Sequence, residues 1–331
     1  MVNKFAFDLD GTLVDKKGKL VNGVVELFNN TIKQNMYPKF LICTGNDVGA
    51  VKETVNEINN ELKTKYNQEP IKFAISACAG AVIIDEDGQQ IRETSLSYDD
   101  FNNIFEKTKS IDPKAIVLFR DDKNLYYTAP KSLSKENLKI LTLKIITKLK
   151  PIGDFKVVAL DASKRDALLK ANKIRSLEIL TLSSEKNKII TGALSKEFKD
   201  LTVSPGFTIQ VSDGSKLDSI KEVFGDNLEE VMYMGDGYND IIPMKSCKIS
   251  FAVGKKSKVL QSATIALQEF GDVNKVLFEQ VDYSEKSKQV IENAKKQEAL
   301  KAEKKEMGRI KYATKKLSNK LHKNSDQGQE K

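Results

Sequence analysis

Tryptophan is absent from the sequence, and histidine and cysteine are scarce. The one histidine, His322, lies in a lysine-rich segment near the C-terminus, so the side chain that most often acts as a general base is missing elsewhere. The three cysteines, at positions 43, 78 and 247, lie far apart and form no CxxC pair, which argues against a zinc site or a disulfide framework. Acid-base chemistry in this chain is therefore expected from carboxylates or lysines.

Long apolar runs are also missing. No stretch approaches the roughly 20 apolar residues that a membrane-spanning helix needs. The N-terminal sequence MVNKFAFDLDGT carries carboxylates where a secretory signal has its apolar segment. Hydrophobic residues make up 40% of the chain and charged residues 30%, as in ordinary globular proteins, and 331 residues suffice for about two domains. We therefore expect a cytoplasmic protein with no membrane span.

Positive charge is concentrated at the C-terminal end. Residues 284–331 hold 14 Lys and Arg against 7 Asp and Glu, out of 54 and 46 in the whole chain, so most of the net charge of +8 belongs to this tail. The tail could bind nucleic acid, an acidic lipid surface or a partner helix, or it could be a solvated and partly disordered helix. Apolar residues recur at heptad spacing from Leu300 to Leu321, but Glu303 and Thr314 interrupt the register.

The order of hydrophobic segments predicts an α/β fold. Short apolar strands over 4–9, 39–43 and 73–77 alternate with helical patterns over 21–34 and 47–63, which favours a parallel sheet with helices on its faces.

A different pattern follows the turn at 85–88, with neighbouring strands paired, and the single alternation resumes at residue 216. We therefore predict a Rossmann-like parallel-sheet core interrupted by an inserted α/β domain. The predicted boundaries are 1–90 for the first part of the core, 91–200 for the insertion, 201–283 for the second part of the core and 284–331 for a helical or disordered tail. Within the insertion, helices are predicted over 98–109, 134–148, 164–174 and 186–199.

Two aspartates end the first predicted strand, in the sequence DLDGT. A bend at Gly11 would let the carboxylates of Asp8 and Asp10 reach one pocket. One can then attack phosphorus as a nucleophile, while the other donates a proton to the leaving alcohol oxygen. The alternative is an ordinary strand followed by an Asp-Gly turn, but the four fixed identities of DxDGT favour the catalytic interpretation.

A second acidic pair follows the strand predicted over 231–234. In GDGYND, Asp236 and Asp240 stand four residues apart across a strand-to-helix turn, so both can face one cation. Carboxylate oxygens are hard ligands, and the absence of a neighbouring histidine or cysteine favours Mg²⁺. A turn with an Asn or Asp helix cap is the alternative.

Polar residues also follow a second strand and begin a late helix. Thr44 and Gly45, in CTGND, can donate hydroxyl and amide hydrogens to phosphoryl oxygens, although Thr44 or Asn46 could equally cap the next helix. Lys216, which otherwise would be one of many surface lysines, can neutralise phosphoryl charge. The carboxyl ends of parallel strands share one edge of a sheet, so all these residues are expected to meet there.

In order along the chain, DLDGTLV, CTGND, Lys216 and GDGYNDIIPM resemble the four successive motifs of the haloacid dehalogenase superfamily. An acid at position 10 is typical of the phosphatases and phosphomutases of that family. The insertion is similar to the large α/β cap of Cof-type sugar phosphatases.

The resemblance implies a role for each matching residue. Asp8 would be the nucleophile that forms an aspartyl phosphate and a Mg²⁺ ligand, and Asp10 the general acid and base, with its backbone carbonyl on the metal. Asp236 would bind Mg²⁺ directly and Asp240 would support the metal site.

Thr44, Gly45 and Lys216 would hold the phosphoryl group. Three positions near the site depart from the family pattern, namely Asn46 in place of arginine, Ala79 in place of asparagine and Lys255 in place of asparagine.

The resulting prediction is a Mg²⁺-dependent phosphatase for a small phosphorylated metabolite, such as a sugar phosphate, a nucleotide or a cofactor. A phosphomutase of the same superfamily is an alternative. A regulatory protein whose basic tail contacts nucleic acid or acidic surfaces is another, although the intact acidic motifs argue against a protein without catalysis.

Overall fold

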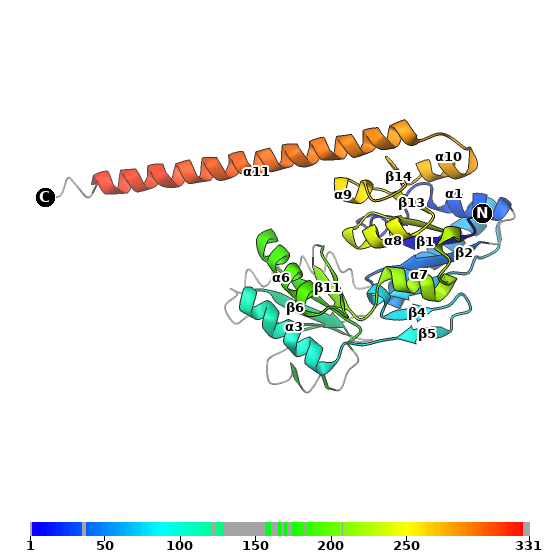
Figure 1. The fold of residues 1–331 in the computed structure, drawn as a ribbon, viewed down its shortest axis with the longest axis horizontal. Helices are drawn as coiled ribbons and strands as arrows, with labels where there is room; N and C mark the ends of the chain where they lie inside the picture. Colours follow the sequence, from blue (N-terminus) through cyan, green and yellow to red (C-terminus); the bar gives the residue numbers. More distant parts are fainter. Residues whose placement is uncertain are drawn as a thin grey trace.

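The described part of the chain forms two separate β-sheets and, toward the C-terminus, one long helix (Figure 1). A computed structural model describes residues 2–34, 38–120, 124–128, 156–159, 165–166, 169–170, 174–181, 183–206 and 208–326. Among the helices of these residues, none combines the length and the apolar composition that crossing a membrane requires.

The larger sheet has eight strands in the order β14-β13-β12-β1-β2-β3-β4-β5. Neighbours from β14 to β3 run parallel, and β4 and β5 are added as an antiparallel hairpin. The strands are β1 (Lys4–Asp8), β2 (Lys39–Cys43), β3 (Ala74–Ala77), β4 (Val82–Ile84), β5 (Gln90–Glu93), β12 (Val231–Gly235), β13 (Ile249–Ala252) and β14 (Ile265–Ala266).

Helices cover both faces of this sheet because its central strands are apolar on both sides. In β1, Phe5 and Phe7 pack on one face, where Phe28 meets Phe7 edge to face, and Ala6 packs on the other. The first face is covered by α1 (Val24–Lys33), α2 (Val48–Tyr66) and α10 (Asp272–Phe278). The second is covered by α7 (Lys216–Phe224), α8 (Ile241–Ser246), α9 (Ser257–Leu260) and the start of α11 (Ser284–Asp326).

The smaller sheet, the cap sheet, has the order β10-β11-β9-β6-β7-β8. Its strands are β6 (Ile116–Arg120), β7 (Asn124–Thr128), β8 (Lys156–Ala159), β9 (Ser176–Leu180), β10 (Thr202–Ser204) and β11 (Ile209–Ser212). Helices α3 (Tyr98–Ile111) and α6 (Ser184–Glu197) pack on it and share its hydrophobic core. The cap sheet is thus a second folded unit inserted into the chain of the first, as Figure 1 shows.

The cap extends further along the chain than the boundaries predicted from sequence. Strands β10 and β11 belong to the cap sheet, where β11 pairs with β9, so the prediction that the core resumes at residue 201 is wrong. The order of strands and helices alone does not specify which sheet a strand joins. The helix predicted over 134–148 lies outside the described residues, as does most of the one over 164–174.

The tail, expected to be helical or disordered, is helical over Ser284–Asp326, and its first turns pack on the core. Ala294 is buried, and the hydroxyl of Ser287 accepts a hydrogen bond from the backbone N–H of Ala266 at 2.9 Å. The Glu298 carboxylate accepts from both the N–H and the hydroxyl of Ser257. The far part of α11 extends past the rest of the molecule, as Figure 1 shows.

Candidate active site

Three neighbouring parallel strands end at the site. β1 lies between β2 and β12. Asp8 is the last residue of β1, Thr44 directly follows β2, and Asp236 directly follows β12. The polar residues begin where the buried apolar strands stop, so the side chains that follow emerge at one edge of the sheet. The common edge expected from the sequence is therefore present.

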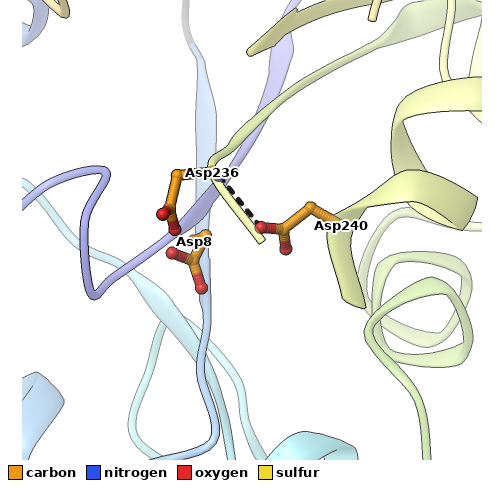
Figure 2. A group of neighbouring side chains, drawn as sticks. All are labelled: Asp8, Asp236 and Asp240. Atoms are coloured by element: carbon orange, nitrogen blue, oxygen red, sulfur yellow. Dashed lines mark hydrogen bonds between the residues drawn. The ribbon is translucent and has the colours of Figure 1, made fainter. Parts of the chain in front are cut away.

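Three carboxylates converge at this edge. Each of Asp8, Asp236 and Asp240 offers an oxygen that lies within 4.8 Å of those of the other two, and Figure 2 shows the side chains pointing toward one another. Asp8 and Asp240 are buried, and Asp236 is partly buried. Like charges this close repel in a medium of low dielectric constant, so the cluster requires cations.

Lys216 supplies one such cation. It begins α7, which is capped by the Ser215 side chain, and its side chain is only 4% exposed. Its Nζ donates to Oδ1 of Asp8 at 2.5 Å and to Oδ1 of Asp240 at 2.6 Å. Lys216 is therefore a bridging ion-pair partner at the site, and the alternative of an ordinary surface lysine is excluded.

Asp240 has hydrogen-bond donors on both carboxylate oxygens. Oδ1 accepts from Lys216 and from the hydroxyl of the buried Tyr233 at 2.7 Å. Oδ2 accepts from the backbone N–H groups of Asp236 at 3.0 Å and Gly237 at 2.7 Å. This carboxylate thus fixes both Lys216 and the turn that carries Asp236. Figure 2 draws its hydrogen bond from the backbone N–H of Asp236.

The turn after β1 carries Asp10 and brings Gly11 against Asp236. Gly11 has a φ of +88°, and a Cβ at that position would lie 2.8 Å from the Asp236 carboxylate, so only glycine fits there. Asp10 is exposed, and its Oδ2 accepts from Nδ2 of Asn46 at 2.7 Å. Asp10 is thus on the exposed side of the site, while Asp8, which accepts from the Thr12 hydroxyl at 3.2 Å, is buried.

The loop after β2 is held by its own hydrogen bonds. The buried Thr44 hydroxyl accepts from the backbone N–H of Asn46 at 3.1 Å, and the Thr44 N–H donates to the carbonyl of Ser76. The cap of the following helix is Asp47, which accepts from the N–H of Ala50, so neither Thr44 nor Asn46 fills that role. The alternative interpretation of Thr44 as a helix cap is therefore wrong.

The charged groups shift one another's pKa values. Burial raises the pKa of Asp8 well above its usual value, Lys216 opposes that effect, and the other two carboxylates add to it. Burial likewise raises the pKa of Asp236, against the influence of Lys256. Burial opposes the charge on Lys216, but Asp240 and Asp8 outweigh it and raise the pKa of this lysine. The site thus holds more negative charge than its lysines offset.

A divalent cation fits this arrangement. The donor set consists of hard carboxylate oxygens, which Mg²⁺ prefers. Lys256 is a second nearby cation, but its side chain is 43% exposed, and its Nζ donates to the backbone carbonyl of Asp236 at 3.0 Å and lies 3.5 Å from Oδ2. Of the four residues predicted to bind the metal, Asp8, Asp10, Asp236 and Asp240, the structure brings together the carboxylates of Asp8, Asp236 and Asp240. That Mg²⁺ binds there stays a prediction.

Sequence reasoning missed three contributors. Tyr233 reads as one more apolar strand residue, Asn46 is predicted only as a possible helix cap and as a departure from the family pattern, and the sequence predicts no role for Lys256. The position of Tyr233 two residues before GD in a strand that ends at the site is a signal that could have revealed it, since alternate strand residues share a face.

Most of the sequence matches a family model. A family model described as haloacid dehalogenase-like hydrolase covers residues 5–270. The chain belongs to this family. The match ends before the basic tail, so the expected nucleic-acid or acidic partner of residues 284–331 stays a prediction.

Relatives and solved structures agree with this family. The hydrolase is 23% identical over 270 residues to YxeH of Bacillus subtilis (strain 168), across 76% of this chain and 88% of YxeH. A solved haloacid dehalogenase-like hydrolase from B. subtilis gives a TM-score of 0.64 at 16% identity, over 84% of this chain and 100% of its own. The subclass IIB sugar phosphatase BT4131 gives 0.57 at 16% identity, over 83% and 98%. The predicted family and the capped Rossmann-like fold of this hydrolase are confirmed.

Proposed function

We propose that this hydrolase is a Mg²⁺-dependent phosphatase that cleaves the phosphoester of a small metabolite through an aspartyl phosphate on Asp8. The observation that carries the proposal is the position of Lys216, whose Nζ holds Oδ1 of Asp8 at the end of β1 and Oδ1 of Asp240. This contact fixes the orientation of one Asp8 oxygen and places positive charge where a phosphoryl group would arrive.

In the first step, an Asp8 carboxylate oxygen attacks phosphorus, and the bond from phosphorus to the alcohol oxygen breaks. Asp10, on the exposed side, donates its proton to that oxygen as the alcohol leaves. Lys216 and the donors of the Thr44–Gly45 loop would stabilise charge on the phosphoryl oxygens.

In the second step, water attacks the phosphorus of the aspartyl phosphate. Asp10 accepts a proton from that water, the bond between Asp8 and phosphorus breaks, and inorganic phosphate leaves. Both carboxylates return to their initial state, so the cycle is balanced. The cap would exclude other nucleophiles while the phosphoenzyme exists.

Mg²⁺ would be held by the carboxylates of Asp8 and Asp236 and by the backbone carbonyl of Asp10, and when bound it supplies positive charge beside the phosphoryl group. Asp240 would act indirectly, because both of its oxygens already accept hydrogen bonds from the protein. Its role would be to hold Lys216 and the Asp236 turn.

The direct test is release of inorganic phosphate from a panel of phosphorylated sugars, nucleotides and cofactors, with and without Mg²⁺. Asp8→Asn is the catalytic control, and Asp87→Asn, which changes an exposed carboxylate paired with Lys72, is the matched control. We expect release that depends on Asp8 and is lost in EDTA. Release that survives Asp8→Asn, or no release from any compound, would refute the proposal.

Among the three substrate classes, we propose a sugar phosphate over a nucleotide or a cofactor, because the structural neighbour BT4131 is a sugar phosphatase. A phosphomutase remains the alternative from the same chemistry. A requirement for a sugar bisphosphate, with transfer to sugar in place of water, would favour the mutase.

A further inference from the structure

One hydrogen bond joins the cap sheet to the loop after β2. Nε2 of Gln210 donates to the backbone carbonyl of Gly45 at 3.0 Å. In β11, Gln210 lies between Ile209 and Val211, which are buried in the cap core, so strand alternation directs it to the opposite face. That face of the cap therefore contacts the active-site loop directly.

The contact depends on the absence of a side chain at position 45. A Cβ on Gly45 would lie 2.5 Å from Oε1 and 3.0 Å from Nε2 of Gln210. Any larger residue would displace the amide of Gln210 from the carbonyl. The loop and the cap side chain are thus fitted to each other.

The held carbonyl belongs to the same peptide group as the N–H of Asn46, and a peptide group is planar and rigid. Gln210 holds the carbonyl of this plane, and the Thr44 hydroxyl accepts from its N–H at 3.1 Å. The plane is therefore fixed from the cap on one side and from the core on the other.

The side chain that follows this plane reaches the proposed acid. Nδ2 of Asn46 donates to Oδ2 of Asp10 at 2.7 Å. A shift of the Gly45–Asn46 peptide would move the Asn46 side chain and release this oxygen. Asp10 is exposed, so the fixed loop beside it limits the orientations of its carboxylate.

We propose that Gln210 and Asn46 are positioning residues that orient Asp10 when the cap is seated on the core. The inference rests on the proposed phosphatase function and adds a coupling between cap and proton donor. When the cap rests on the loop, Gln210 fixes the Gly45 carbonyl and Asn46 fixes the Asp10 carboxylate. The Asp10 carboxylate is then oriented for proton donation only while the cap is seated on the core.

The test compares two substrates that differ in their need for a proton donor. An aryl phosphate such as p-nitrophenyl phosphate has a leaving group that departs unprotonated, whereas an alkyl phosphate requires protonation as it leaves. Gln210→Glu keeps the size of the side chain but replaces the donor by an acceptor, and Asn46→Ala removes the second donor. We measure kcat/KM, because it reports the step in which the leaving group departs.

For the alkyl phosphate we expect each variant to lower kcat/KM about tenfold. This loss is smaller than the roughly hundredfold or greater loss expected when a general acid is removed altogether. For the aryl phosphate we expect a change of less than about twofold. The double variant should lose about as much as one single variant, because both act on the same carboxylate. Asn46→Gln, which retains an amide donor, should recover part of the loss.

Gln89→Glu is the matched control, since it makes the same charge change at an exposed position of the β4–β5 turn. Equal losses on both substrates, multiplicative losses in the double variant, or wild-type values for Gln210→Glu would overturn the inference and leave the phosphatase proposal intact. Absence of phosphatase activity in the wild-type protein would overturn both.

Discussion

Replacing Lys216 with methionine removes a buried cation that two buried carboxylates share. The exposed fraction of the side chain is 4% for Lys216, 9% for Asp8 and 0% for Asp240. Methionine has a similar shape and volume, so the packing of α7 is largely kept and the lost interaction is electrostatic.

The expected cost follows from the partners that remain. Removing one member of a buried ion pair typically costs about 3–5 kcal/mol, because the other member is left uncompensated. Asp240 retains Tyr233 and two backbone N–H donors, whereas Asp8 retains the longer contact with the Thr12 hydroxyl. Most of the penalty therefore falls on Asp8, and we expect a loss of about 3 kcal/mol in the free energy of unfolding.

Urea unfolding in EDTA, followed by far-UV circular dichroism, measures this loss, since the chain has no tryptophan to report by fluorescence. Lys256→Met is the matched control. Its ammonium is half-exposed and 3.5 Å from the Asp236 carboxylate, so we expect a loss of at most about 1 kcal/mol. In turnover with Mg²⁺, Lys216→Met should lower kcat/KM by about a hundredfold or more.

An unfolding free energy equal to that of the wild type for Lys216→Met would refute the reasoning. So would equal losses for the two lysine variants, because burial would then not determine the cost. A stability loss without a loss of turnover would assign Lys216 a structural role alone.

Three further predictions concern the metal, a thiol and the tail. Mg²⁺ at ten times its dissociation constant should stabilise the wild-type protein by about 1.4 kcal/mol in a thermal-shift assay, and Asp236→Ala should abolish the response. Burial raises the pKa of the Cys247 thiol to about 12. Alkylation of this thiol below pH 9, followed by mass spectrometry, should therefore be at least about a hundredfold slower in the native than in the unfolded protein. Because the native pKa is the higher one, the free energy of unfolding should fall as the pH rises from 9 toward 12. Deleting residues 299–331 should change the free energy of unfolding by less than about 0.5 kcal/mol, whereas deleting 284–331 should lower it by about 2–4 kcal/mol, because buried contacts of α11 with the core are lost.

The parts of the site that lie next to strand ends were predictable from the sequence. An apolar strand that stops at a run of aspartate, glycine and threonine marks where a buried backbone meets solvent, and parallel strands bring such points together. Asp8, Thr44 and Asp236 lie at three neighbouring strand ends for this reason. Their roles in catalysis stay predictions until turnover is measured.

The parts that depend on pairing between distant segments were not predictable. Strands β10 and β11 belong to the cap because β11 pairs with β9. No local sequence pattern encodes this pairing. The contact of Tyr233 with Asp240 depends on which face of β12 meets α7, and the contact of Asn46 with Asp10 depends on two loops from different strands. Local chemistry indicated candidates, and tertiary packing selected their partners.

The three carboxylates of the site differ in how the protein satisfies them, and this difference separates their roles. Asp240 accepts four hydrogen bonds, all from groups of the protein itself. Asp8 shares Lys216 and accepts from Thr12, and Asp236 has only the longer contact with the half-exposed Lys256 among the ion pairs of the described residues. Since one buried ammonium cannot offset three carboxylates, a divalent cation would be attracted to the two that the protein satisfies least, Asp8 and Asp236. The residue that would attack phosphorus is then also one that would bind the metal.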